Sequence, residues 1–153
     1  LSDPIFLFTT IVAAEDYGSY NYTYIGAGFS VECPANVNIE QSTESGSSSY
    51  SFNYDNQLIL KAYSGLDPDF QKPEPKKCLF EEGWINSCPY CSFKLKEPAG
   101  TVSGQVLITI MNNQELLTYL HYRYEHLSAS QLALAEQIIN STKPYIAAEK
   151  NVF

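Results

Sequence analysis

One short motif contains residue types that could perform chemistry, Cys88-Pro89-Tyr90-Cys91. Two cysteines separated by two residues can reduce a disulfide, because the first thiolate attacks a sulfur and the second thiol resolves the mixed disulfide. Such a thiolate forms near neutral pH only where a helix N-terminus, a cation or a metal lowers its pKa. The motif therefore predicts redox chemistry only if its flanking residues build such an environment.

The tetrapeptide resembles the redox motif of glutaredoxins, in which the first cysteine lies at the N-terminus of a helix that follows a strand. This resemblance implies a thiol–disulfide oxidoreductase with Cys88 as nucleophile and Cys91 as resolving thiol. It covers four residues. Residues 81–87 lack the pattern of a buried strand, and Pro98 and Gly100 disfavour a long helix after the motif. We therefore keep this activity as the alternative and predict no catalytic residues otherwise.

A structural disulfide framework is the favoured explanation of the four cysteines. Cys78, Cys88 and Cys91 lie close together in the sequence, and Cys33 is distant from them. Four cysteines allow three pairings. We favour Cys33–Cys78 with Cys88–Cys91, and the two arrangements that join Cys33 to Cys91 or to Cys88 stay open. Each bridge would stabilise the fold by about 2–4 kcal/mol.

Metal binding has weaker support. A structural zinc site usually combines two paired cysteine knuckles, and only one C-x2-C pair is present. His121 and His126 would diverge by about 140° on a helix, so one metal could not easily bind both. We predict no metal and no cofactor.

A stripe of tyrosines is the candidate binding surface. Tyr20, Tyr22 and Tyr24 alternate along residues 20–32, so they share one face of a predicted strand. Tyrosine rings give a large contact area at little cost in entropy, and together with Trp84 they suit a protein or glycan partner. Ordinary cross-strand packing is the competing explanation.

Charge and composition narrow the class of partner. The 153 residues carry a formal net charge of −8, and most of the acidic excess lies in residues 1–70. An acidic surface repels phosphate, so nucleic acid is an unsuitable partner. No apolar run reaches about 18 residues, so no membrane-spanning helix is predicted. The low charged fraction of 17% with 12 tyrosines indicates a secreted or periplasmic protein.

These residues must be positioned by strands in the first half and helices at the end. Alternating or continuous apolar residues predict strands at 20–32, 50–54, 57–63 and 104–111. Capping signals at Asn112 and Ser128, each followed by an apolar stripe, predict two helices over 113–142. A short buried helix is expected within residues 5–17.

The sequence thus predicts a single α+β domain over 1–153. Its antiparallel sheet has about four to five strands and is covered on one face by the two C-terminal helices. The chain divides into a strand-rich half (1–64), a Cys/Pro-rich region (65–103) that holds a disulfide-stapled irregular module at 65–100, and a strand plus helices (104–153). The functional hypothesis is a secreted, non-catalytic binding or interaction domain, with a host-interaction or inhibitory role.

Overall fold

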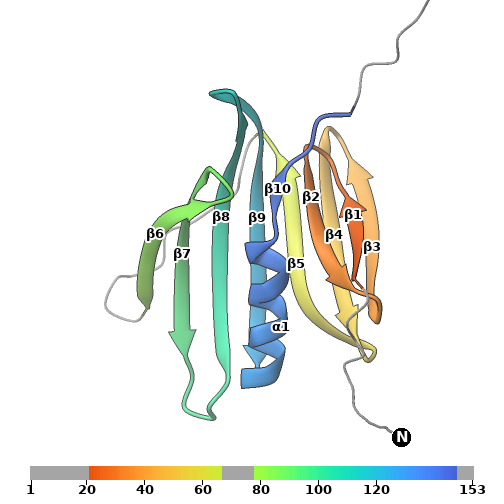
Figure 1. Cartoon of the computed structure of the whole chain (residues 1–153). Coiled ribbons are helices and arrows are strands. Elements are labelled where there is room, and N and C mark those ends of the chain that lie inside the picture. The colour runs from red at the N-terminus through yellow and green to blue at the C-terminus, as the bar shows by residue number, and fades with distance from the viewer. Residues whose placement is uncertain (1–20, 67–77, 148–153) are drawn as a thin grey trace, which may run out of the picture.

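The structure is a computed structural model that describes residues 21–66 and 78–147 (Figure 1). Within these ranges the chain forms ten strands and one helix, α1 (Ala129–Asn140). The strands are β1 (Asn21–Ile25), β2 (Phe29–Pro34), β3 (Val37–Glu44), β4 (Ser47–Tyr54), β5 (Gln57–Gly65), β6 (Leu79–Ile85), β7 (Cys88–Lys96), β8 (Val102–Asn112), β9 (Glu115–Leu127) and β10 (Lys143–Pro144).

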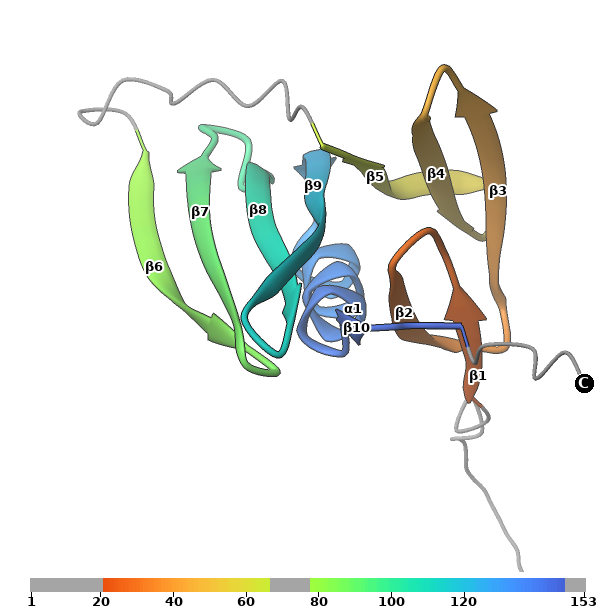
Figure 2. The same cartoon turned by 90° about the horizontal axis from the view of Figure 1, so that it is seen from above.

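The strands make two antiparallel sheets. The large sheet has seven strands in the order β3-β4-β5-β9-β8-β7-β6, and the small sheet has the order β1-β2-β10. Figure 2 shows that the large sheet bends between β9 and β4, so that α1 lies inside the bend with β2 on its other side. We call the face of the large sheet that points away from α1 the outer face.

The hydrophobic core lies between the large sheet, α1 and the small sheet. The helix buries Ala135, Ile138 and Ile139. Alternate residues of β9 face it, among them Leu120 and Tyr122, which are fully buried. Because side chains alternate along a strand, the residues between them lie on the outer face.

Four hairpins connect neighbouring strands of the large sheet through two-residue turns in which both residues have positive φ. This backbone is typical of type I′ turns, whose twist matches that of the paired strands. Asn, Asp and Gly adopt such angles at least cost. The turns are Ser45-Gly46, Asp55-Asn56, Asn86-Ser87 and Asn113-Gln114.

The predicted α+β domain with two C-terminal helices is wrong, because the protein is mostly β. Residues predicted as the first of these helices form β9, the longest strand. Leu120 and Tyr124 fit both a helical stripe and an alternating strand, and β9 pairs with β5 and β8 on either side. Asn113, in the expected first turn, has a φ of 51° and belongs to the turn between β8 and β9.

Other expectations are corrected or confirmed element by element. Residues 79–96, predicted as an irregular module, form the β6–β7 hairpin. The second predicted helix exists as α1. It begins at the expected capping box, in which the Ser128 hydroxyl accepts a hydrogen bond from the Gln131 amide. The helix expected within residues 5–17 lies outside the described residues.

The disulfide prediction is also wrong: no two of the four cysteine sulfurs lie at bonding distance. Cys88 and Cys91 are three positions apart on β7, so their side chains point to opposite faces of the sheet and cannot bridge. Cys33 lies in the small sheet, opposite Tyr22. Cys78 directly precedes β6, on an edge of the large sheet.

Among the described residues, no helix combines the length and the apolar character needed to cross a membrane, as the sequence predicts.

Candidate functional site

Strand pairing aligns side chains in rows across the outer face. One row begins on β3 and contains, in order, Ser42, Ser49, Tyr63, His121, Leu107 and Cys91. The adjacent row contains Glu40, Ser51, Lys61, Arg123, Gln105 and Phe93. Both rows are polar over β3, β4, β5 and β9. The first becomes more apolar at Leu107 on β8, and the second only at Phe93 on β7.

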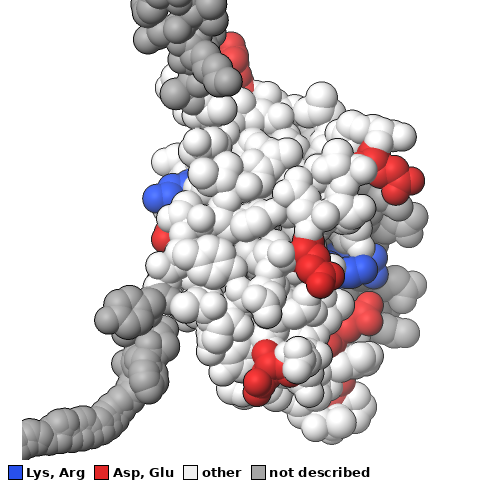
Figure 3. All heavy atoms as spheres, turned by 90° about the vertical axis from the view of Figure 1, so that its right-hand side faces the viewer, with Lys and Arg blue, Asp and Glu red and all other residues white. Residues whose placement is uncertain are grey.

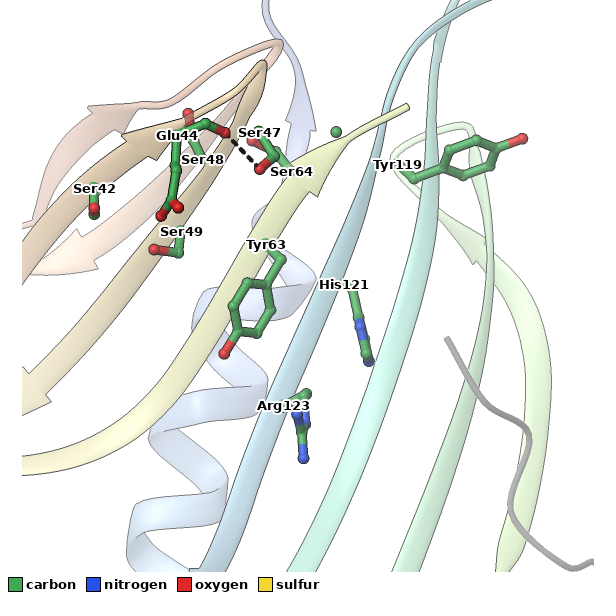
Figure 4. Close-up of a pocket in the computed structure, with 11 residues that line it drawn as sticks. Ser42, Glu44, Ser47, Ser48, Ser49, Tyr63, Ser64, Tyr119, His121 and Arg123 are labelled. Atoms are coloured by element: carbon green, nitrogen blue, oxygen red, sulfur yellow. Dashed lines mark hydrogen bonds between the residues drawn. The ribbon is translucent and has the colours of Figure 1, made fainter. Parts of the chain in front are cut away.

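A groove of about 460 Å³ lies over the polar part of these rows, between the β3–β4 hairpin and strands β5 and β9 (Figure 4). Serine, tyrosine, histidine, arginine and glutamate side chains supply its polar groups. The lining residues are Ser42, Glu44, Ser47, Ser48, Ser49, Tyr63, Ser64, Gly65, Tyr119, His121 and Arg123.

Arg123 is the point at which three depressions of the outer face meet. It lines the groove, a second depression of about 390 Å³ along β5 and a third of about 180 Å³ beside β7. Its Nη2 lies 3.8 Å from the Glu125 carboxylate, and the two side chains are 47% and 69% exposed. A guanidinium has five N–H donors, so within the described part of the chain this one long ion pair leaves most of them available to a ligand.

Tyr63 and His121 form the centre of the groove. Their ring centroids are 6.2 Å apart, with the planes inclined at 47°. The His121 Nε2 lies 2.9 Å from the Gln105 Oε1, which fixes the orientation of the imidazole. His121 is buried, whereas Tyr63 is 37% exposed. A ligand would therefore meet the phenol ring of Tyr63 first.

Four of the five serines of the groove fall into two groups. Ser48 and Ser64 direct their hydroxyls away from it, toward Thr43 at 3.2 Å and Tyr50 at 3.1 Å. Ser42 and Ser49 face each other across β3 and β4 on the outer face. Their hydroxyls can both donate and accept hydrogen bonds at the groove wall.

The predicted tyrosine stripe has a packing role in the structure. The Tyr22 hydroxyl donates to the Val37 carbonyl, and the Tyr24 hydroxyl donates to Gln41 Oε1 over 2.7 Å. The Tyr24 ring also meets Tyr50 edge to face at 6.0 Å. These contacts hold the small sheet against β3 and β4, and desolvation by burial raises the pKa of both phenols.

The other predicted binding residues lie apart from this stripe. Trp84 is 72% exposed on β6, at the opposite edge of the molecule from β1 (Figure 1). Tyr20 lies outside the described residues. The structure therefore does not bring Trp84 together with Tyr22 and Tyr24, and a role for Trp84 in binding stays a prediction.

The cysteine motif lies in a strand and not at the start of a helix. Cys88 is buried at the beginning of β7, and its Sγ lies 3.8 Å from the Met111 carbonyl oxygen. Cys91 lies on the outer face, between Leu107 and Glu82 on the adjacent strands. Cys88 therefore does not begin a helix, as the nucleophile does in the glutaredoxin arrangement, in which the helix N-terminus lowers the pKa of the thiol.

The rate of thiol alkylation should distinguish the half-buried cysteines from the buried ones. Desolvation by burial, with the nearby Glu32 carboxylate, raises the pKa of Cys33 from 9.0 to about 12, which lowers its thiolate fraction at neutral pH by about a thousandfold. We expect iodoacetamide to modify the half-buried Cys78 and Cys91 of the native protein well before Cys33 and the buried Cys88, as followed by peptide mass spectrometry.

In denaturant without reductant, the same reagent should add four groups. Modification of fewer than four cysteines would show that a disulfide is present, as the sequence predicts. Native modification of Cys33 as fast as that of Cys91 would contradict its buried position.

Arg123, Tyr63 and the two outward serines are not among the residues predicted from the sequence. The sequence predicts no strand over residues 42–49, and it predicts residues 113–127 as part of a helix. The alternation of Tyr119, His121 and Arg123 is the signal that could have placed them on one face of a strand.

Comparisons with known proteins add little to this picture. No family model and no curated protein matches the chain. A crystal structure of a protein from Bacteroides thetaiotaomicron, at 1.50 Å resolution, is similar over 85% of this chain, with 15% sequence identity and a TM-score of 0.45. The chain covers 50% of that protein's length. No functional conclusion follows from a likeness at this level.

Proposed function

We propose that this protein is a non-catalytic binding domain whose ligand lies in the outer-face groove at Arg123. The observation that carries the proposal is the meeting of three depressions at one half-exposed guanidinium, whose one ion pair among the described residues is the 3.8 Å contact with Glu125. Arginine recognises acceptors through a planar fork of donors, which makes it suitable as the central contact of a site. The secreted or periplasmic location and a host-interaction or inhibitory role stay predictions.

The groove is built on paired strands, and this favours ligand binding. Tyr63 and Arg123 project from β5 and β9, which pair with each other and with further strands on both sides. The backbone of paired strands is already ordered before a ligand binds, so less of the interaction energy is spent on ordering the site. The cavity volume is within the usual range for small-molecule sites, about 300–1,000 Å³.

The alternative function, a thiol–disulfide oxidoreductase, has less support. Cys88 is buried in a strand and Cys91 points to the opposite face, so a mixed disulfide at one sulfur would be out of reach of the other. Turnover in an insulin reduction assay that is lost in Cys88→Ser would favour this alternative.

Ligand screening by NMR tests the binding proposal. The ¹⁵N-labelled protein is titrated with a mixed library of short peptides, soluble oligosaccharides and small carboxylic acids. We expect the compounds that bind to shift the amide resonances of residues around Tyr63 and Arg123. Arg123→Ala should weaken their binding by about tenfold or more.

Lys143→Ala is the matched control, because Lys143 is an exposed cation on β10, away from the groove. It should bind as the unmodified protein does. The proposal would be refuted if no compound of the library bound at the groove, or if the shifted amide resonances belonged only to other surfaces. Unchanged binding by Arg123→Ala would refute it as well.

A further inference from the structure

We infer that the ligand of the groove is an oligosaccharide built of neutral sugar rings. This inference rests on the proposed function, since it names the chemical class that binds at Arg123. It depends on the kinds of hydrogen-bonding groups in the groove, on the exposed ring at its centre and on its shape and charge.

The groove is lined by three complementary kinds of polar group. The Arg123 guanidinium only donates hydrogen bonds, the Glu44 carboxylate at the far side of the groove only accepts them, and the hydroxyls of Ser42 and Ser49 between them do both. Sugar hydroxyls also donate and accept, so the successive rings of a sugar chain can satisfy all three kinds. A ligand with acceptors alone, such as a phosphate, would match Arg123 but not the Glu44 carboxylate.

Tyr63 supplies the apolar surface that a sugar needs. One face of a pyranose ring carries mainly C–H groups, which pack against an aromatic ring while the hydroxyls at the rim reach polar neighbours. Tyr63 is 37% exposed, and in its row it lies between Ser49 on β4 and His121 on β9. Figure 4 shows Tyr63 projecting beside His121, with Arg123 next to them. An aromatic platform is thus bordered by hydrogen-bonding groups.

The outer face has room for more than one sugar ring. The groove of about 460 Å³ continues past Tyr63 and Arg123 into the depression of about 390 Å³ along β5. Strands are spaced by about 4.8 Å, which is close to the width of a sugar ring. A chain laid across β4, β5 and β9 places about one ring over each strand, and the depression along β5 offers room for a further ring beside them.

The charges around the groove and the side chains that line it disfavour other classes of ligand. This part of the outer face carries three carboxylates, Glu40 and Glu44 on β3 and Glu125 next to Arg123, against the two cations Arg123 and Lys61, so a polyanion would meet more like charge than opposite charge. Figure 3 shows the side of the molecule next to β3, where uncharged atoms dominate and carboxylates are scattered. Leu, Ile, Val, Phe and Met are absent from the side chains that line the groove itself, and Leu58, Ile59 and Leu60 line the adjoining depression along β5. A peptide ligand usually anchors apolar side chains in pockets, and the groove at Tyr63 does not offer them.

The test is a titration of the protein with six-unit oligosaccharides of glucose, mannose, galactose and xylose, and with an oligogalacturonate as an acidic control. We expect at least one neutral chain to shift the amide resonances of Tyr63, His121 and Arg123. Calorimetry of that ligand should show a loss of about tenfold or more in affinity for Tyr63→Ala, and little change for Tyr63→Phe, which keeps the ring.

Two further variants complete the design. Tyr145→Ala is the matched control, because Tyr145 is also 37% exposed but lies outside the groove, and it should bind normally. Ser49→Val removes a groove hydroxyl with a residue that suits a strand, and it should weaken binding independently of Tyr63.

Three results would overturn the inference. They are binding of the acidic chain alone, the absence of binding by every neutral chain, and equal affinity of Tyr63→Ala and the unmodified protein for the ligand. If the peptides or carboxylic acids of the mixed library shift the groove residues and no neutral sugar does, the binding site stands and its assignment to saccharides falls.

Discussion

Replacing Leu120 with alanine is expected to lower the free energy of unfolding by about 3 kcal/mol. Leu120 is fully buried in β9, between Ser64 on β5 and Ile108 on β8, and it faces the core around α1. Truncation removes buried apolar surface and leaves a cavity that neighbours on two strands cannot readily fill. Urea unfolding followed by circular dichroism measures the change.

Leu116→Ala is the matched control for this variant. Leu116 belongs to the same strand but is 41% exposed, so its truncation should cost less than about 1 kcal/mol. Similar losses for the two variants would contradict the burial of Leu120 in the core. The comparison therefore tests the packing of the middle of β9 between β5 and β8, whereas Leu116 lies beyond the bulge near the β8–β9 turn.

Replacing Gly104 with alanine should destabilise the fold by about 2–3 kcal/mol through overpacking. A Cβ at this position of β8 would collide with the Tyr124 hydroxyl and would lie 2.8 Å from the Phe93 carbonyl oxygen. The tyrosine side chain can move at some cost, but the carbonyl belongs to the backbone of the paired strand β7. Thermal unfolding of the variant measures the effect.

Gly65→Ala provides the comparison, because its Cβ would lie 3.4 Å from Ser47 Cβ, an ordinary contact. We expect a change within about 0.5 kcal/mol. A Tyr124→Leu background should reduce the Gly104→Ala penalty, since the two positions share one space and their effects are then not additive. Equal stability of the two glycine variants would contradict the close approach of β8 and Tyr124.

Several elements could be predicted because the information for them is local. Alternating or continuous apolar residues identified strands within 50–54, 57–63 and 104–111, all of which belong to β4, β5 and β8. The Ser128 cap identified the start of α1 because its hydrogen bond joins residues three positions apart. Such signals depend on neighbours in the sequence, so they survive without knowledge of the fold.

The error over residues 113–127 shows where local information ends. The spacing of Leu117, Leu120, Tyr124 and Leu127 is compatible with a helix, and nothing nearby in the sequence excludes it. Pairing with β5 and β8 stabilises the strand over the helix. It forms backbone hydrogen bonds on both edges of β9, and it buries Tyr122 as well. The disulfide error has a related cause: cysteine spacing does not reveal the face of the sheet on which each thiol lies.

By itself, the sequence determined the polar, weakly charged character of the protein, most of its central strands and the position of its helix. The candidate site was decided by the tertiary structure alone. Ser42, Ser49, Tyr63 and His121 come from four strands and share one row only because β3, β4, β5 and β9 pair in a particular register. That register depends on hydrogen bonds between distant segments, and a shift by one residue would turn each side chain to the other face.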